Sequence, residues 1–387
     1  MLALLLLIYL SFISLGLPDS LLGAAWPSMY GSLHVPLHYA GFISMIIAGG
    51  AVISSIFSER IIKRLGTGVV TAASVAMTAA ALIGFSVSGS FLYLCLCAVP
   101  LGLGAGSVDA ALNNYVALHY KARHMSWLHC FWGIGASAGP IIMSSFLIHK
   151  QSWSLGYRTI GIIQCCLALL LLFSLRLWKG STSTGKVAHH NSITFTKLFG
   201  IAGVKEVVMA FFCYCTVETV TGLWGASYLV MEKGIPPEIA AQWIALFYIG
   251  ITLGRFLSGF VTMKLNNRQM IRLGQIIIGS GIVVLVLPFG TTTLLPGLFM
   301  MGLGCAPIFP CLIHQTPKNF GEEHSQAIVG LQMGSAYIGV TLMPLLFGRI
   351  ASLPFMSFKI FPIFIGIVLI AIILMVEVLN KKVGGVE

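Results

Sequence analysis

The sequence predicts an all-α membrane protein of about twelve transmembrane helices. The chain is 57% hydrophobic and only 9% charged, with a mean hydropathy of +0.95, whereas a soluble domain carries about 25% charged residues. A water-soluble fold is therefore excluded. Because each helix needs about 20 apolar residues to cross the hydrocarbon layer, a chain of 387 residues with short loops accommodates about twelve spans.

Twelve apolar segments form two sets of six, separated by one long polar stretch. This stretch begins at Lys179 and includes His189 and His190, which we interpret as solvated linker residues. We expect an N-terminal six-helix bundle (1–178), a cytoplasmic linker (179–204) and a C-terminal six-helix bundle (205–387). The predicted spans are 1–28, 40–62, 69–89, 91–118, 125–148, 155–177, 206–230, 239–263, 268–288, 293–315, 325–348 and 358–380.

The net charge of +11 predicts topology and not nucleic-acid binding, because the Lys and Arg residues gather in alternate loops. About 16 fall on one side and about five on the other, so the positive-inside bias places both termini in the cytoplasm. We expect a multi-pass protein of the plasma membrane, in bacteria the inner membrane. The predicted outer basic residues are Lys150, Arg158, Lys233, Arg349 and Lys359.

Three short patterns recur in corresponding helices of the two halves. Each is weak alone, because glycine is abundant, but together they indicate a duplicated six-helix unit. Parallel repeats of this kind place a solute site near the bilayer midplane, between the halves. The paired patterns are Asp19-Ser20-x-x-Gly23 with Glu218-Thr219-x-x-Gly222, Gly102-Leu103-Gly104 with Gly302-Leu303-Gly304, and Gly135 and Pro140 with Gly339 and Pro344.

Polar motifs in five helices carry a resemblance that spans most of the chain. They are Gly16-Leu17-Pro18-Asp19-Ser20, Val108-Asp109-Ala110-Ala111-Leu112-Asn113-Asn114-Tyr115, Tyr214-Cys215-Thr216-Val217-Glu218, Gly250-Ile251-Thr252-Leu253-Gly254-Arg255 and Ala306-Pro307-Ile308-Phe309-Pro310. At these positions the chain resembles the fucose-permease-like sugar transporters of the major facilitator superfamily. The resemblance implies the major facilitator fold of two six-helix bundles.

The resemblance also implies roles for particular residues. In that family, an Asp in helix one, together with an acidic residue and an Asn in helix four, is associated with sugar binding and proton coupling. These roles fall on Asp19, Asp109 and Asn113.

The superfamily has a basic loop signature after helix two, and a copy of it after helix eight. The first copy is degenerate here and contains Glu59, Arg60 and Arg64, while the second, with Arg255 and Lys264, is closer to the pattern. We expect these five residues to hold the cytoplasmic gate.

Three carboxylates, those of Asp19, Asp109 and Glu218, lie deep within predicted spans. An ionisable group there costs several kcal/mol unless it is paired or wet, so we interpret all three as ion-coupling residues. A carboxyl group facing a partly dry cavity can load and release a proton as the cavity opens to alternate sides. Two alternatives stay open: a carboxylate could hydrogen-bond a helix broken at Pro18, or two carboxylates could form a sodium site.

Sugars expose hydroxyls around an apolar ring face, so a sugar site combines amides and carboxylates with an aromatic platform. For Gln164 and His314 a role in helix packing is an equal alternative, and His129 could be a core residue or a proton-transfer group. The candidate substrate-binding residues are Asn113, Asn114, Glu218, Trp224, His129, Gln164, His314 and Gln332.

Together these features predict a secondary transporter that takes up a monosaccharide or similar small polar solute by alternating access, in symport with H⁺ or Na⁺. A proton-coupled exporter of drugs or amphiphilic molecules is the alternative, because the fold does not fix the function. The sequence holds no convincing nucleophile and base, metal-ligand cluster or ATP-binding motif, so we expect neither an enzyme nor a bound cofactor or metal. The expected partners are the solute and the lipid bilayer, with no nucleic acid, and the expected state is a monomer.

Overall fold

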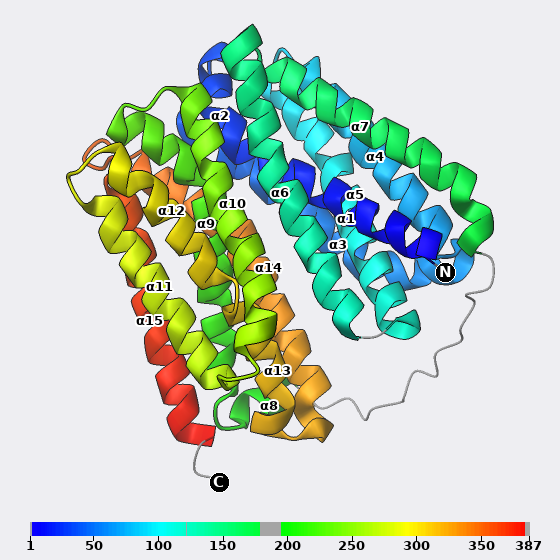
Figure 1. The fold of residues 1–387 in the computed structure, drawn as a ribbon, viewed down its shortest axis with the longest axis vertical. Coiled ribbons are helices and arrows are strands. Elements are labelled where there is room, and N and C mark those ends of the chain that lie inside the picture. The colour runs from blue at the N-terminus through cyan, green and yellow to red at the C-terminus, as the bar shows by residue number, and fades with distance from the viewer. Residues whose placement is uncertain (1, 121, 179–194, 384–387) are drawn as a thin grey trace. The chain divides into compact units, whose positions relative to one another are not determined.

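A computed structural model describes residues 2–120, 122–178 and 195–383, and all regular structure in these residues is helical (Figure 1). Within the described residues, twelve helical stretches are long and apolar enough to span a membrane, which confirms the predicted fold class. Most of the predicted linker, including His189 and His190, lies outside the described residues. The helices are α1 (Leu2–Asp19), α2 (Leu21–Ser32), α3 (Ala40–Leu65), α4 (Thr67–Ser86), α5 (Phe91–His119), α6 (Ala122–Lys150), α7 (Trp153–Phe173), α8 (Phe195–Gly200), α9 (Val204–Lys233), α10 (Pro237–Val261), α11 (Asn267–Val286), α12 (Thr291–Cys305), α13 (Ile308–Phe320), α14 (Glu322–Ala351) and α15 (Ile360–Val383), with short 3₁₀ turns at Leu37–Tyr39 and Ser174–Trp178.

Two of the twelve spans each consist of two helices joined by a short non-helical break. The first span consists of α1 and α2 with a break at Ser20, and the tenth consists of α12 and α13 with a break at Ala306 and Pro307. Pro18 has no backbone N–H and weakens the helix just before the first break. Non-helical backbone at membrane depth is tolerated only where protein or water satisfies it. Asp19 is the last residue of α1, directly before this break.

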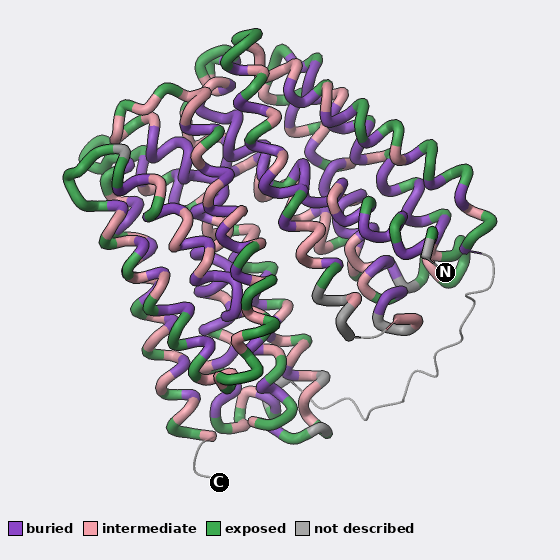
Figure 2. Tube along the Cα trace, in the orientation of Figure 1, coloured by how far each residue is buried: buried purple, intermediate pink, exposed green. Residues whose placement is uncertain are grey.

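The spans differ in how many of their residues are buried inside the protein, which distinguishes interior spans from lipid-facing ones (Figure 2). In the first and seventh spans, 78% and 72% of the apolar stretch is buried in the protein, against 28% in the second span. Large apolar side chains such as Ile56, Phe173 and Ile363 are exposed, as expected for surfaces that contact lipid. The helices that carry Asp19 and Glu218 are thus the interior helices of the fold.

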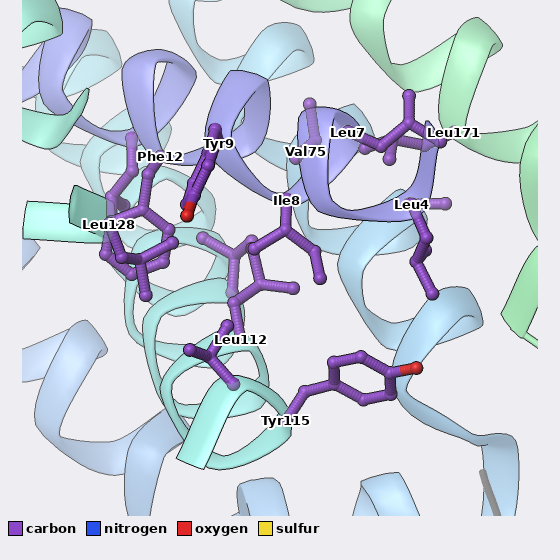
Figure 3. Close-up of a cluster of buried hydrophobic side chains, with 14 of the residues drawn as sticks. Leu4, Leu7, Ile8, Tyr9, Phe12, Val75, Leu112, Tyr115, Leu128 and Leu171 are labelled. Carbon is purple, nitrogen blue, oxygen red and sulfur yellow. The ribbon is translucent and has the colours of Figure 1, made fainter. Parts of the chain in front are cut away.

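The chain forms two compact units, and the first contains residues 1–183, 222–249 and 344–358. Its core is a cluster in which Ile8 and Phe12 of α1 pack with Leu112 of α5, Leu128 of α6 and Leu171 of α7 (Figure 3). Because lipid is as apolar as these side chains, the close packing itself, and not expulsion of water, holds such helices together. The cluster fixes α1 and α6 against each other.

Parts of α9, α10 and α14 belong to the first unit. The backbone of Gly222 lies so close to Gly23 that no side chain would fit at residue 23. The Ser144 hydroxyl donates to the backbone carbonyl of Glu238 over 2.7 Å. These three helices therefore continue from one compact unit into the other, and the predicted division into bundles at residues 1–178 and 205–387 stays a prediction.

The second unit contains residues 184–221, 250–343 and 359–387. Helix α11 begins with a capping box in which Asn266 and Gln269 each accept the other's backbone N–H. Arg272 of α11 donates two hydrogen bonds of 2.7 Å to Glu377 of α15, and Figure 1 shows these two helices side by side. This pair of charges is exposed and links the two helices.

Glycine contacts inside each unit repeat with an offset of about 200 residues. Gly104 of α5 lies against the backbone of residues 74 and 78 in α4, and Gly304 of α12 lies against residues 274 and 278 in α11. Gly135 of α6 lies against the carbonyl of Ile13, and Gly339 of α14 against that of Phe212. The recurring sequence patterns thus correspond to recurring helix contacts, as a six-helix duplication requires.

Candidate functional site

Asp19 pairs with an aromatic residue of α6. The indole Nε1 of Trp132 donates a hydrogen bond of 2.7 Å to the Asp19 carboxylate. Asp19 is exposed although its neighbours Pro18 and Ser20 are buried, and Trp132 is half-buried. Because Gly16 lies against the Trp132 backbone, α6 approaches α1 closely enough for this bond. The arrangement offers a carboxylate beside an aromatic ring, the two parts that a sugar site needs.

Asp109 pairs with an amide one helical turn away in α5. The Asn113 side chain donates to the Asp109 carboxylate over 2.8 Å and to the Asp109 backbone carbonyl over 3.0 Å. Both residues are half-buried, and Asn114 is exposed. The spacing of four residues, which places side chains on one helix face, explains the contact. The amide holds the carboxylate in one orientation and leaves its second oxygen for another partner.

Glu218 of α9 lies in a cluster of polar side chains in the second unit. The buried Tyr214 hydroxyl donates to one carboxylate oxygen over 2.5 Å. The other oxygen faces the Arg255 guanidinium of α10 at 3.7 Å, and the two side chains are 19% and 18% exposed. Arg255, which the sequence indicated as a gate residue, is thus a partner of a carboxylate inside a span.

Two of the expected substrate residues are engaged in packing. The Trp224 indole is fully buried, donates to the Pro344 carbonyl over 2.8 Å and packs on other aromatic rings. The buried Gln164 accepts from Thr78 over 2.7 Å and donates to the Ser14 carbonyl over 2.6 Å. Because their polar atoms already have protein partners, we leave both residues out of the proposed site.

The other three candidates contact residues other than the carboxylates described above. Gln332 is buried and accepts from Thr316 over 3.1 Å. His314 is exposed in α13, with its Nδ1 2.9 Å from the Asn267 amide. His129 is half-buried and meets the Phe12 ring edge to face at 5.9 Å. Their roles in solute binding stay predictions.

The remaining gate candidates lie at helix ends. Arg60 and Arg64 are exposed in the last turns of α3, and Lys264 is exposed in the turn after α10. The side chain of Glu59 lies outside the described part of the chain. Their role in gating stays a prediction.

Sequence reasoning missed Trp132 and Tyr214. Tyr214 precedes Glu218 by four residues, so helical periodicity contained the signal for this contact. Trp132 and Asp19 are separated by 113 residues, and no local pattern links them. Only the packing of α6 on α1 brings that pair together.

The chain has twelve spans, helix contacts that recur in its two halves, and carboxylates in interior helices. These features define a polytopic transport protein. The Major Facilitator Superfamily profile matches residues 8–273 and 207–384 of this chain. The chain belongs to the Major Facilitator Superfamily, whose members are transporters and not enzymes.

Two relatives are similar over much of the chain. Bypass of stop codon protein 6 of Saccharomyces cerevisiae is 26% identical over 67% of this chain, and the matched part covers 56% of the yeast protein's length. The Glucose/mannose transporter GlcP of Bacillus subtilis is 23% identical over 82% of this chain and 78% of its own length.

A crystal structure of the nucleoside transporter NupG has the same fold. It covers 95% of this chain and 98% of its own, with a TM-score of 0.75 and 14% sequence identity. At this level of identity the likeness shows the fold alone. The match confirms the expected all-helical fold.

Proposed function

We propose that this protein is an uptake symporter that carries a monosaccharide, or a similar small polar solute, together with H⁺ or Na⁺ by alternating access. The observation that supports this most directly is the pair formed by Asp19 and Trp132, because a carboxylate beside an indole ring suits a hydroxylated ring. The similarity to a glucose and mannose transporter supports the same class of solute. We also propose that the chain is one of the fucose-permease-like sugar transporters, which its polar motifs resemble.

In this proposal the coupling ion binds at Asp19 and Asp109. Asp19 is exposed within a mostly buried span and accepts from the Trp132 indole, and Asp109 is half-buried and accepts from the Asn113 amide. Protonation of such a group removes a charge from the membrane interior, which lowers the cost of returning the loaded site across the bilayer. Asn113 and Asn114 are the proposed amide contacts to the solute.

The test is a flux assay in proteoliposomes that contain the purified full-length protein. A panel of labelled monosaccharides is supplied with an imposed proton gradient, a sodium gradient or neither. We expect accumulation of at least one sugar under one gradient and only equilibration without a gradient.

Parallel measurements with a labelled amphiphilic cation test the exporter alternative. Proton-driven movement of the cation, with no sugar uptake under either gradient in vesicles that contain folded protein, would contradict the symporter proposal and support the exporter.

A further inference from the structure

The ion pair between Glu218 and Arg255 differs from the other Arg–Glu pair in the second unit. Arg272 donates one hydrogen bond of 2.7 Å to each carboxylate oxygen of Glu377. The closest atoms of Glu218 and Arg255 are 3.7 Å apart, beyond the usual N–H···O range of about 2.7–3.2 Å. The pair inside the span is therefore held together by charge but not closed by a direct hydrogen bond.

Tyr214 fixes the geometry of this open pair. Its hydroxyl donates to one Glu218 oxygen over 2.5 Å, and its own ring is fully buried. The ring packs on Phe309, with the ring centroids 6.1 Å apart. Because one oxygen is held by a buried donor, the other oxygen stays directed at Arg255.

The gap between the two charged groups suits a hydroxyl. A hydroxyl group donates one hydrogen bond and accepts others, so it can donate to the Glu218 carboxylate and accept from the Arg255 guanidinium at the same time. An oxygen about 2.8 Å from both groups fits beside a pair whose atoms are 3.7 Å apart. Nearly a fifth of each side chain is exposed, so both are reachable.

The same charges disfavour a coupling ion at this position. The Arg255 guanidinium keeps its positive charge under all physiological conditions. A cation bound to Glu218 would lie within a few ångströms of that like charge, in a poorly solvated part of the protein. The coupling ion is therefore expected at Asp19 or Asp109.

We propose that Glu218 and Arg255 bind one hydroxyl group of the transported solute, with Tyr214 as the residue that positions the carboxylate. This inference rests on the proposed function as a monosaccharide transporter. It removes Glu218 from the ion-coupling residues.

The experiment measures how well singly deoxygenated and singly fluorinated analogues compete with the labelled sugar for uptake into proteoliposomes. For the wild-type protein, loss of the hydroxyl at one ring position should weaken competition about 10- to 100-fold, because that hydroxyl makes charge-assisted hydrogen bonds. Fluorine at the same position cannot donate to Glu218, so the fluorinated analogue should compete as poorly as the deoxygenated one.

The decisive variant combines Glu218→Leu with Arg255→Met and Tyr214→Phe. Replacing both charges together avoids an unpaired charge in the membrane interior, and adding Tyr214→Phe removes the buried hydroxyl that would otherwise lose its acceptor. Discrimination at the one ring position should fall to near unity, while discrimination at the other positions remains. The matched control, Arg272→Met with Glu377→Leu, removes the closed Arg–Glu pair and should keep the wild-type pattern.

Two single variants separate binding from coupling. Tyr214→Phe should raise the KM for the parent sugar and weaken discrimination at the same ring position, with the maximal rate unchanged. Glu218→Gln should raise the KM for the sugar, because it loses a charge-assisted contact, but at saturating sugar it should still accumulate sugar under the driving gradient.

Either of two results would overturn the inference: the triple variant keeps the wild-type ranking of analogues, or Glu218→Gln loses accumulation while exchange persists. If the wild-type protein carries no monosaccharide at all, the proposed function fails first, and this inference fails with it.

Discussion

At the scale of single residues, the most important feature is that Asp19 is exposed while its neighbours in the chain are buried. The buried residues of α1 pack against other helices, whereas Asp19 is exposed at the point where the helix breaks and is held by the Trp132 indole. A charged residue kept at such a point, in an interior span, is costly unless it is used. Two different substitutions can remove its charge and its hydrogen bond to Trp132 separately.

Removing the charge tests ion coupling. Asp19→Asn and Asp109→Asn should each abolish concentrative uptake under the driving gradient while sugar exchange across the vesicle membrane continues, because an amide can bind solute but cannot carry the ion. Counterflow and gradient-driven uptake, measured on the same vesicles, distinguish these activities. Full accumulation by both variants would show that the coupling ion binds elsewhere.

Removing the hydrogen bond tests the orientation of the carboxylate. Trp132→Phe keeps an aromatic ring but loses the Nε1 donor, and a hydrogen bond to a charged group contributes about 1.5–3 kcal/mol. The variant should therefore bind sugar more weakly, because the carboxylate is no longer held in one orientation, yet still accumulate it. Loss of accumulation in Trp132→Phe would assign the indole to coupling instead.

At the scale of helices, sequence and structure agree where the signal is local and repeated. The twelve spans follow from apolar length, and the contact of Asn113 with Asp109 follows from helical spacing. The pairing of Trp132 with Asp19 joins helices remote in sequence, so composition and periodicity carried no information about it. Trp224 follows Glu218 by six residues in the sequence, but its indole is buried and donates to the Pro344 carbonyl.

Helix contacts at glycine give a stability prediction. A methyl group on Gly102 of α5 would collide with the Ile47 backbone of α3, whereas one on Gly49 of the same α3 meets nothing within 4 Å. Gly102→Ala should lower stability by about 1–3 kcal/mol through overpacking. Gly49→Ala should be neutral or stabilising by about 0.5–1 kcal/mol, because alanine favours a helix. Thermal unfolding in detergent measures both, and equal melting temperatures would contradict the close approach of α3 and α5.

At the scale of the whole molecule, the distribution of basic residues predicts how the chain lies in the membrane. Lys150 ends α6 and Lys264 follows α10, and both side chains are exposed. The positive-inside bias assigns Lys264 to the cytoplasmic side and Lys150 to the opposite side. Lys150→Cys should thus react with a membrane-impermeant maleimide in intact cells, and Lys264→Cys only after the cells are permeabilised. The wild-type chain contains nine cysteines and supplies the labelling background. The two substitutions are chemically identical and differ only in the predicted side of the membrane. Reversed labelling would therefore place both termini outside and move every loop to the side opposite to the predicted one.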